Sequence, residues 1–158
     1  MSGLELMSLV AAIIMVESSG NDNAINHREQ AYGPMQIRQC VLDDVNRVYR
    51  TNYKLSQMRN RSTSLEVFKK YTRIYKADAN QESAAKCWNA GPGWKSKTGT
   101  AKSNLNEYWR KVQQQLKELA LCPKNSATAA MARKRASQPC RTLSIRVFPE
   151  RERHLMVA

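Results

Sequence analysis

The sequence predicts an all-α domain, and three observations support this prediction. Apolar residues recur at spacings of three and four in several segments between residues 3 and 122. Glycine, proline and asparagine separate these segments. Neither a hairpin signal nor the alternating pattern of a strand occurs before residue 140. We therefore expect one helical domain at residues 1–122, followed by a basic and poorly ordered C-terminal tail at residues 123–158.

The first predicted helix runs from about Gly3 to Glu17. Its apolar run from Leu9 to Val16 ends at Glu17, and the turn-forming residues SSGN follow. A helix that is apolar all round is normally buried, so we expect Glu17 at the buried end of a core helix. Burial raises the pKa of a carboxyl group, which is what a general acid needs near neutral pH. From the local sequence alone, a carboxylate that merely ends a helix is the simpler interpretation.

Four more helices are predicted downstream, at about residues 36–50, 64–76, 80–90 and 104–122. Sequences of the form T-x-x-E at Thr63 and N-x-x-E at Asn104 are typical of capping boxes, and they place the starts of the third and fifth helices. Asp78 or Asn80 is expected to cap the fourth helix, which Gly91 ends. The connecting residues 18–36, 51–61 and 94–103 are predicted loops.

The chain is strongly basic, with a net charge of +13. Residues 1–122 carry 18 basic and 11 acidic side chains, and residues 123–158 carry 8 and 2, so both parts contribute. Such a protein is drawn to polyanions, including nucleic acid, anionic lipid and bacterial wall polymers. The tail sequence NSATAAMARKRASQP predicts disorder or a frayed helix, and TLSIRVF alternates like a short strand without a partner.

The N-terminus and the cysteines give weaker signals. The first 20 residues include an apolar stretch of signal-peptide length, but they lack a basic start and contain Glu5, so we interpret them as a helix of the fold. The stretch is too short to span a bilayer.

The four cysteines show no zinc-binding spacing and are interpreted as separate packed thiols, although their even number also permits two disulfides. They are Cys40, Cys87, Cys122 and Cys140.

Three sequence blocks occur in order on this helical framework: ESSGN at residues 17–21, AYGPMQI at 31–37 and CWNAGPGW at 87–94. Together they resemble the lysozyme-like lytic transglycosylases, the soluble lytic transglycosylase domain family, which is related in fold to goose-type lysozyme. The resemblance covers most of residues 4–116. It implies a lysozyme-like enzyme of bacterial or bacteriophage origin that cleaves peptidoglycan.

The resemblance implies that Glu17 is the catalytic acid. Glu17 would protonate the glycosidic oxygen between N-acetylmuramic acid and N-acetylglucosamine, and would then act as base on the muramyl C6 hydroxyl to give a 1,6-anhydro product. A hydrolase would instead activate water, usually with a second carboxylate. Glu29 is the best candidate for that role, ahead of Asp22, Asp43 and Asp44. We expect no cofactor and no metal.

The same resemblance implies several substrate contacts. Gln36 would hydrogen-bond the sugar amide or hydroxyls, and Met35 would line the cleft. In the family a tyrosine hydrogen-bonds the catalytic glutamate; here Trp88 replaces it, and its ring would further desolvate Glu17. Core packing is the alternative for Met35 and Trp88. The remaining expected contacts are Ser18, Asn89 and Trp94, with Trp94 as a platform on which sugars stack.

A binding protein is the alternative from another class. It would keep the scaffold but act through its charge, holding a wall polymer or nucleic acid, and the ARKR sequence in the tail favours this hypothesis. For the enzyme we expect peptidoglycan strands as substrate and action outside the cytoplasm, in the periplasm, the cell wall or a phage particle. With no convincing signal peptide in the chain, a secretion apparatus or a phage particle is a candidate partner.

Overall fold

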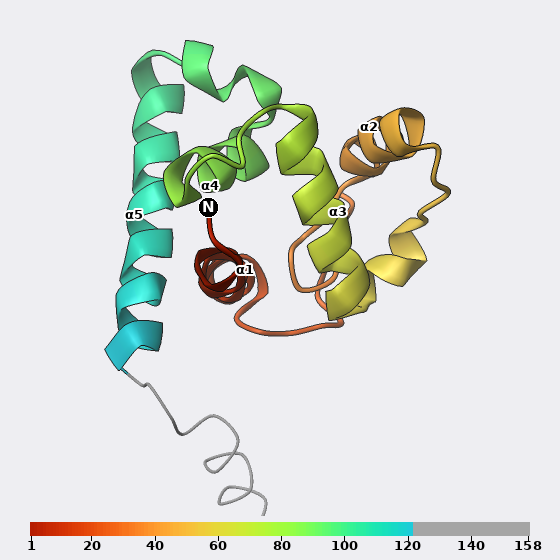
Figure 1. Cartoon of the computed structure of the whole chain (residues 1–158), viewed down its shortest axis with the longest axis horizontal. Helices are drawn as coiled ribbons and strands as arrows, with labels where there is room; N and C mark the ends of the chain where they lie inside the picture. Colours follow the sequence, from red (N-terminus) through yellow and green to blue (C-terminus); the bar gives the residue numbers. More distant parts are fainter. Residues whose placement is uncertain (122–158) are drawn as a thin grey trace, which may run out of the picture. The chain divides into compact units, whose positions relative to one another are not determined.

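The computed structural model describes residues 1–121, which are mainly helical (Figure 1). Helices α1 and α5 pack against each other, α4 contacts both, and α3 contacts α2 and α4. The all-α prediction is confirmed. The principal helices are α1 (Gly3–Ser18), α2 (Gln39–Tyr49), α3 (Arg61–Ile74), α4 (Gln81–Ala90) and α5 (Gly99–Leu121). Two short 3₁₀ helices are η1 (Leu55–Arg59) and η2 (Pro92–Ser96).

Helix α1 forms the centre of the fold, and in Figure 1 it is seen nearly end-on beside α5. It begins with a capping box, in which the Glu5 backbone N–H donates to Ser2 Oγ at 3.2 Å and the Ser2 N–H donates to the Glu5 carboxylate at 2.7 Å. It ends at Ser18 because Ser19 adopts the left-handed conformation, with φ 52°. The predicted extent of this helix is confirmed to within one residue.

The starts of α3 and α5 differ from the predictions. Asn60 caps α3, since its Oδ1 accepts from the Thr63 N–H at 3.0 Å, so the predicted capping box at Thr63 is wrong. The Asn60 side chain, three residues before Thr63, already accepts the hydrogen bond of the Thr63 N–H. Helix α5 begins at Gly99, so the predicted start at Asn104 and the loop at 94–103 are also wrong. The residues between Gly99 and Asn104 include no helix breaker, and helix can extend through them.

The other two helices agree better with the sequence. Asn80 caps α4, accepting from the Ser83 N–H at 2.8 Å, and Gly91 ends it at φ 76°. Helix α2 lies within the predicted span but begins at Gln39, because Arg38 before it has an extended backbone. The predicted tail, its strand, Cys122 and Cys140 lie outside the described residues.

The loop between α1 and α2 contains a small antiparallel hairpin. Strands β1 (Ile25–Asn26) and β2 (Ala31–Tyr32) pair, and Tyr32 then forms a further bridge with Ile37 through hydrogen bonds of 3.0 and 2.9 Å. The prediction that no hairpin occurs before residue 140 is therefore wrong. Two-residue strands are too short to produce a visible alternating pattern.

The core is formed where the helices meet, and it includes Leu9, Ile13, Phe68 and Val112, each with no exposed surface. Cys87 is buried, and burial raises its pKa to about 11. Cys40 is exposed, so the prediction of a packed thiol is wrong at that position.

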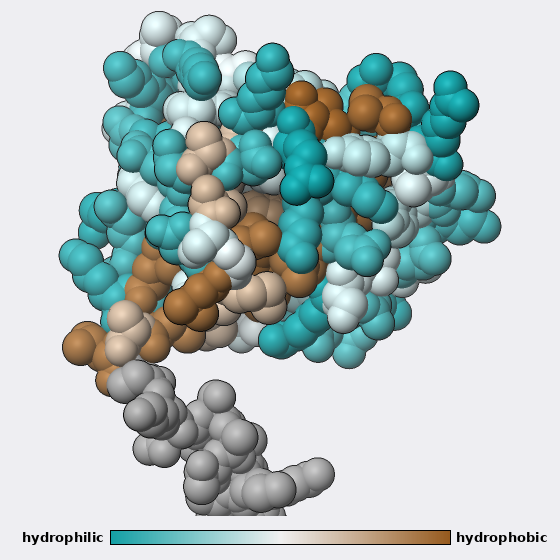
Figure 2. All heavy atoms as spheres, in the orientation of Figure 1, coloured by the Kyte–Doolittle hydropathy of each residue, from teal (hydrophilic) through white to brown (hydrophobic). Residues whose placement is uncertain are grey.

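Most of the surface seen in Figure 2 is hydrophilic, with apolar side chains gathered toward the end of α5. Leu119 and Leu121 are exposed at that end of the helix. Among the described helices, none combines the length and the apolar character that crossing a membrane requires.

Candidate active site

Glu17 lies in the last turn of α1, where α1 packs on α5. Its Oε1 accepts a hydrogen bond of 2.8 Å from the Tyr108 hydroxyl on α5. Burial is the largest influence on the carboxyl group and raises its pKa above the usual value. The Tyr108 hydrogen bond and the charge of Arg38 oppose this shift, and the charge of Glu29 adds to it. The net result is a carboxyl group that holds its proton more firmly than an exposed glutamate.

Tyr108 is the site residue that sequence reasoning missed. It is buried, and burial followed by the neighbouring Glu17 charge raises its pKa well above the usual value, so it remains a hydrogen-bond donor. In the sequence it belongs to the apolar face of the last helix. The available signal was chemical, because a tyrosine hydroxyl on a buried face needs a hydrogen-bond partner.

Trp88 stands where the family has a tyrosine, but its indole is not hydrogen-bonded to Glu17. Its indole Nε1 donates to the Met35 carbonyl oxygen at 3.3 Å, and its ring packs edge-on against Phe68 and Tyr71 at centroid distances of 5.0 and 5.8 Å. Only 7% of its surface is exposed. That small remainder lines the same pocket as Glu17, so Trp88 joins the core to the pocket wall.

The pocket beside Glu17 has a volume of about 230 Å³. It brings together residues from α1, the hairpin loop, the start of α2 and the end of α4, which are far apart in sequence. Four of the predicted site residues, besides Glu17 itself, lie on it. Its lining is Glu17, Glu29, Gln36, Arg38, Val41, Trp88 and Asn89.

Gln36 and Met35 lie in different surroundings although they are adjacent. Gln36 has a positive φ of 49°, and its Nε2 donates to the Gly33 carbonyl at 2.9 Å and to the Ala24 carbonyl at 3.4 Å. Gln36 thus shapes the loop as well as lining the pocket. Met35 has no exposed surface, so its side chain belongs to the core and the expectation that it lines the cleft is corrected.

Ser18 and Trp94 do not line this pocket. The Ser18 hydroxyl donates back to the Ile14 carbonyl at 3.1 Å, a bond within the helix. Trp94 is half-buried on η2 and packs against the core, with the Lys95 ammonium 5.5 Å from its ring centroid. Sugar stacking on Trp94 therefore remains a prediction for a surface outside the pocket.

The other carboxylates proposed as alternatives to Glu29 have partners elsewhere. Asp22 pairs with Arg61 at 2.5 Å, and Asp43 accepts from Gln39 at 2.8 Å. Asp44 accepts from Tyr75 and Arg47, and the Tyr75 hydrogen bond is the main reason that its pKa is lowered. None of the three aspartates lines the pocket. Glu29 is exposed, lines the pocket, and is the second carboxylate of the site.

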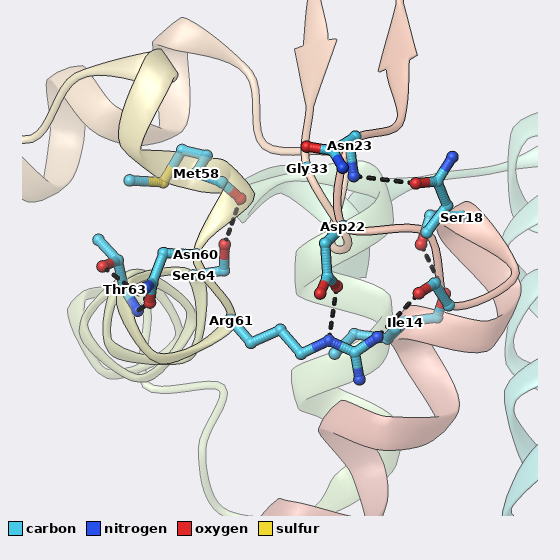
Figure 3. Close-up of polar contacts among 12 residues, drawn as sticks. Ile14, Ser18, Asp22, Asn23, Gly33, Met58, Asn60, Arg61, Thr63 and Ser64 are labelled. Carbon is cyan, nitrogen blue, oxygen red and sulfur yellow. Dashed lines mark hydrogen bonds and ion pairs between the residues drawn. The ribbon is translucent and has the colours of Figure 1, made fainter. Parts of the chain in front are cut away.

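The loop that carries Glu29 is tied to the start of α3 (Figure 3). The Arg61 side chain reaches across to this loop, where its Nε pairs with Asp22 Oδ1 at 2.5 Å and its Nη2 donates to the Gly20 carbonyl at 2.8 Å. Both contacts fall within five residues of Glu17. The segment that follows α1 is therefore held at a second point.

Gly33 provides a third point of attachment, where the loop packs on η1. Its backbone packs so closely on η1 that an added Cβ would lie 1.9 Å from the Met58 carbonyl oxygen, and its φ is 77°. The same Met58 oxygen accepts from Ser64 Oγ at 2.7 Å, which joins η1 to α3 (Figure 3). Only glycine fits this position without displacing the loop.

This arrangement suits acid catalysis in a polar pocket. It offers one partly buried carboxyl group with a raised pKa, one exposed carboxylate and amide groups for hydrogen bonding. Within residues 1–121, no cluster of three or more His, Cys, Asp and Glu side chains could hold a metal ion.

The fold and the site define a lysozyme-like helical domain with a partly buried glutamic acid at its pocket. A family model described as the transglycosylase SLT domain matches residues 5–111, well over half of the chain. The protein belongs to this family, whose members act on peptidoglycan outside the cytoplasm. No curated protein and no solved structure matched the chain.

Proposed function

We propose that this protein cleaves the β-1,4 bond between N-acetylmuramic acid and N-acetylglucosamine, with Glu17 as the general acid and then the base, and leaves 1,6-anhydromuramyl ends. The observation that carries this proposal is the partial burial of Glu17 at the pocket, with its carboxyl group bonded to Tyr108. Its raised pKa increases the protonated fraction that can donate to the glycosidic oxygen.

The second half of the reaction needs a base and a nucleophile. After giving up its proton, the Glu17 carboxylate accepts the proton of the muramyl C6 hydroxyl, and that oxygen attacks C1 to close the anhydro ring. The Tyr108 hydroxyl, which donates to Glu17 Oε1, stabilises the carboxylate during this interval. One protein carboxyl group is thus sufficient, since the nucleophile belongs to the substrate.

Gln36, Trp88 and Asn89 are proposed to contact the sugars, because they line the pocket together with Glu17. Asn89 is exposed and polar, which suits hydrogen bonds to sugar hydroxyls and acetamido groups. Trp88 is an aromatic residue that lines the pocket with little exposed surface. Polar groups together with an aromatic residue are appropriate for a carbohydrate.

A hydrolytic reaction is the second candidate, and Glu29 favours it. Glu29 lies on the same pocket as Glu17 and its charge acts on the Glu17 carboxyl group. In that reaction Glu29 would activate a water molecule, and the product would carry a reducing end. The exposed position of Glu29 leaves it well solvated, so the transglycosylase reaction is the better-supported proposal.

The experiment is digestion of purified peptidoglycan by the full chain, followed by mass spectrometry of the released muropeptides. Wild-type protein should release them, and Glu17→Gln should lower the rate by about a thousandfold, the size expected when a general acid is lost. Glu118→Gln makes the same chemical change on an exposed part of α5 and should keep the wild-type rate. Equal rates for wild type and Glu17→Gln would overturn the proposal.

Stability measurements separate lost chemistry from lost folding in this variant. The pKa of Glu17 is raised in the folded protein, so its stabilising contribution is complete below the ordinary value of 4.5 and is lost as pH rises through the folded value. A Gln does not ionise, so Glu17→Gln should be more stable than wild type at pH 7. This advantage should disappear in acid, as measured by thermal unfolding at several pH values.

The setting of this activity follows from the substrate. We propose a catalytic domain at residues 1–122 that works in the periplasm, the cell wall or a phage particle, with peptidoglycan strands as its partner. The basic residues 123–158 would hold anionic polymers without specificity. A secretion apparatus or a phage particle is the candidate assembly for a chain with this activity.

A further inference from the structure

Arg38 is the basic residue of the pocket, and neither the proposed reaction nor the sequence analysis assigns it a role. It lines the pocket with Glu17, Glu29 and Gln36, and its side chain is exposed. Among the hydrogen bonds and ion pairs of residues 1–121, none involves the Arg38 guanidinium group. Its five N–H donors are therefore available to a bound molecule.

The backbone beneath this side chain is firmly placed. Ile37 is fully buried and is paired with Tyr32 through two backbone hydrogen bonds of 3.0 and 2.9 Å. Arg38 follows directly, as the extended residue just before α2, and its side chain makes no capping bond there. A guanidinium group on a fixed backbone at a pocket wall loses less freedom on binding than one on a mobile loop.

The positive charge of Arg38 disfavours the proposed reaction, unless that charge also has another role. The positive charge of Arg38 lowers the pKa of Glu17 and so opposes the burial that keeps the acid protonated. A cation that lines the same pocket as the proposed general acid is better explained by an anionic group that enters the pocket with the substrate. Carboxylates fit this description, because guanidinium groups bind them through two parallel hydrogen bonds.

We propose that Arg38 binds a carboxylate carried by the N-acetylmuramic acid residue, and this inference rests on the proposed function. That carboxylate has two chemical sources. The lactyl group of the muramyl residue ends in a free carboxylate when no peptide is attached, and in an amide when a stem peptide is attached. In the second case the carboxylate comes from the acidic residues of the peptide. Neutral chitin-type oligosaccharides lack both.

Binding measurements test this inference independently of turnover. The protein is the full chain with Glu17→Gln, titrated by calorimetry with alternating N-acetylglucosamine and N-acetylmuramic acid oligomers. Three forms are compared: peptide-free with the lactyl carboxylate, peptide-free with that carboxylate converted to an amide, and peptide-bearing. Arg38→Gln, Arg38→Lys and, as a matched control, Arg110→Gln are added to this background; Arg110 is exposed on α5 and does not line the pocket.

The expected result is that the carboxylate form binds about tenfold more tightly than the amide form, the size of one charge-assisted interaction. Arg38→Gln should remove this difference, Arg38→Lys should retain part of it, and Arg110→Gln should leave it unchanged. If the Arg38 dependence appears only with peptide-bearing strands, the peptide supplies the carboxylate and the inference still holds.

Two outcomes would overturn it. One is that all three forms bind equally to the Glu17→Gln protein, and the other is that the preference for the carboxylate survives Arg38→Gln. If Arg38 acts only on the acidity of Glu17, its variants would shift the pH profile of cleavage while leaving the three affinities in the same ratio. Failure of cleavage by the wild-type protein, by contrast, would contradict the proposed function and not the binding result.

Discussion

The pocket has two walls that are built in different ways. The helical wall, defined as Glu17, Trp88 and Asn89 with Tyr108 bonded to Glu17, is held by packing between α1, α4 and α5. The loop wall, defined as residues 20–38, is held mainly by backbone bonds, by the Arg61 contacts and by the close approach of Gly33 to η1. Packing by the helices therefore sets the acidity of Glu17, whereas the loop presents the polar side chains of Glu29, Gln36 and Arg38 to the pocket.

The largest effect on the loop wall should come from Gly33→Ala. The added Cβ meets the Met58 carbonyl oxygen and the φ of 77° disfavours any side chain, so we expect a loss of about 3 kcal/mol in the free energy of unfolding. Urea denaturation gives this value. Gly3→Ala is the control, because an added Cβ there meets no atom within 4 Å. Equal stabilities for the two variants would show that the loop wall does not depend on this contact.

On the helical wall, Tyr108→Phe should cost about 1 kcal/mol of stability and change the pH profile of cleavage. The Tyr108 hydrogen bond lowers the pKa of Glu17, so its removal should raise that pKa further. Activity that requires protonated Glu17 falls as pH rises through its pKa, and the alkaline limb of the profile should therefore move to higher pH. The profile is measured as initial rates of muropeptide release.

Tyr53→Phe is the matched control for this change. The Tyr53 hydroxyl also donates to a carboxylate, that of Glu66 at 2.9 Å, but neither residue lines the pocket. Its pH profile should equal that of the wild type. An alkaline limb that stays in place or moves to lower pH in Tyr108→Phe would contradict the assigned role of the hydrogen bond.

The smallest effect should come from Arg61→Met, which removes both contacts of Arg61 with the loop wall. The Arg61 and Asp22 side chains are about half exposed, so the stability change should be within about 1 kcal/mol and the fall in kcat/KM up to about fivefold. Asp22→Asn leaves the Gly20 bond in place and should have a smaller effect. Arg47→Met breaks an ion pair with Asp44 outside the pocket, and a loss of activity equal to that of Arg61→Met would contradict a specific role for Arg61.

Much of the helical wall could be predicted from the sequence, because the apolar run before Glu17 and the caps at Asn80 and Gly91 are local signals. Tyr108 could not, since its bond to Glu17 joins residues 91 positions apart and depends on how α1 packs on α5. The start of α3 could not be predicted because several nearby residues can cap a helix, and that of α5 because the helix extends through residues that carry no cap signal.

The loop wall was predicted only in part. The GPMQI residues indicate Gln36 but not the burial of Met35, which depends on core packing between segments far apart in the sequence. Arg38 carries no signal in the sequence, because an arginine next to the start of a helix is common. Its significance comes from the pocket that it shares with Glu17, and that pocket exists only in the folded chain.

The most direct test of the central claim is the identity of the new chain ends when digestion is carried out in water enriched in oxygen-18. Attack by the muramyl C6 hydroxyl predicts ends that are lighter than reducing ends by one water molecule and free of the label, for the wild type and for Glu29→Gln. Labelled reducing ends from the wild type, together with loss of activity in Glu29→Gln, would contradict the account and establish hydrolysis assisted by Glu29.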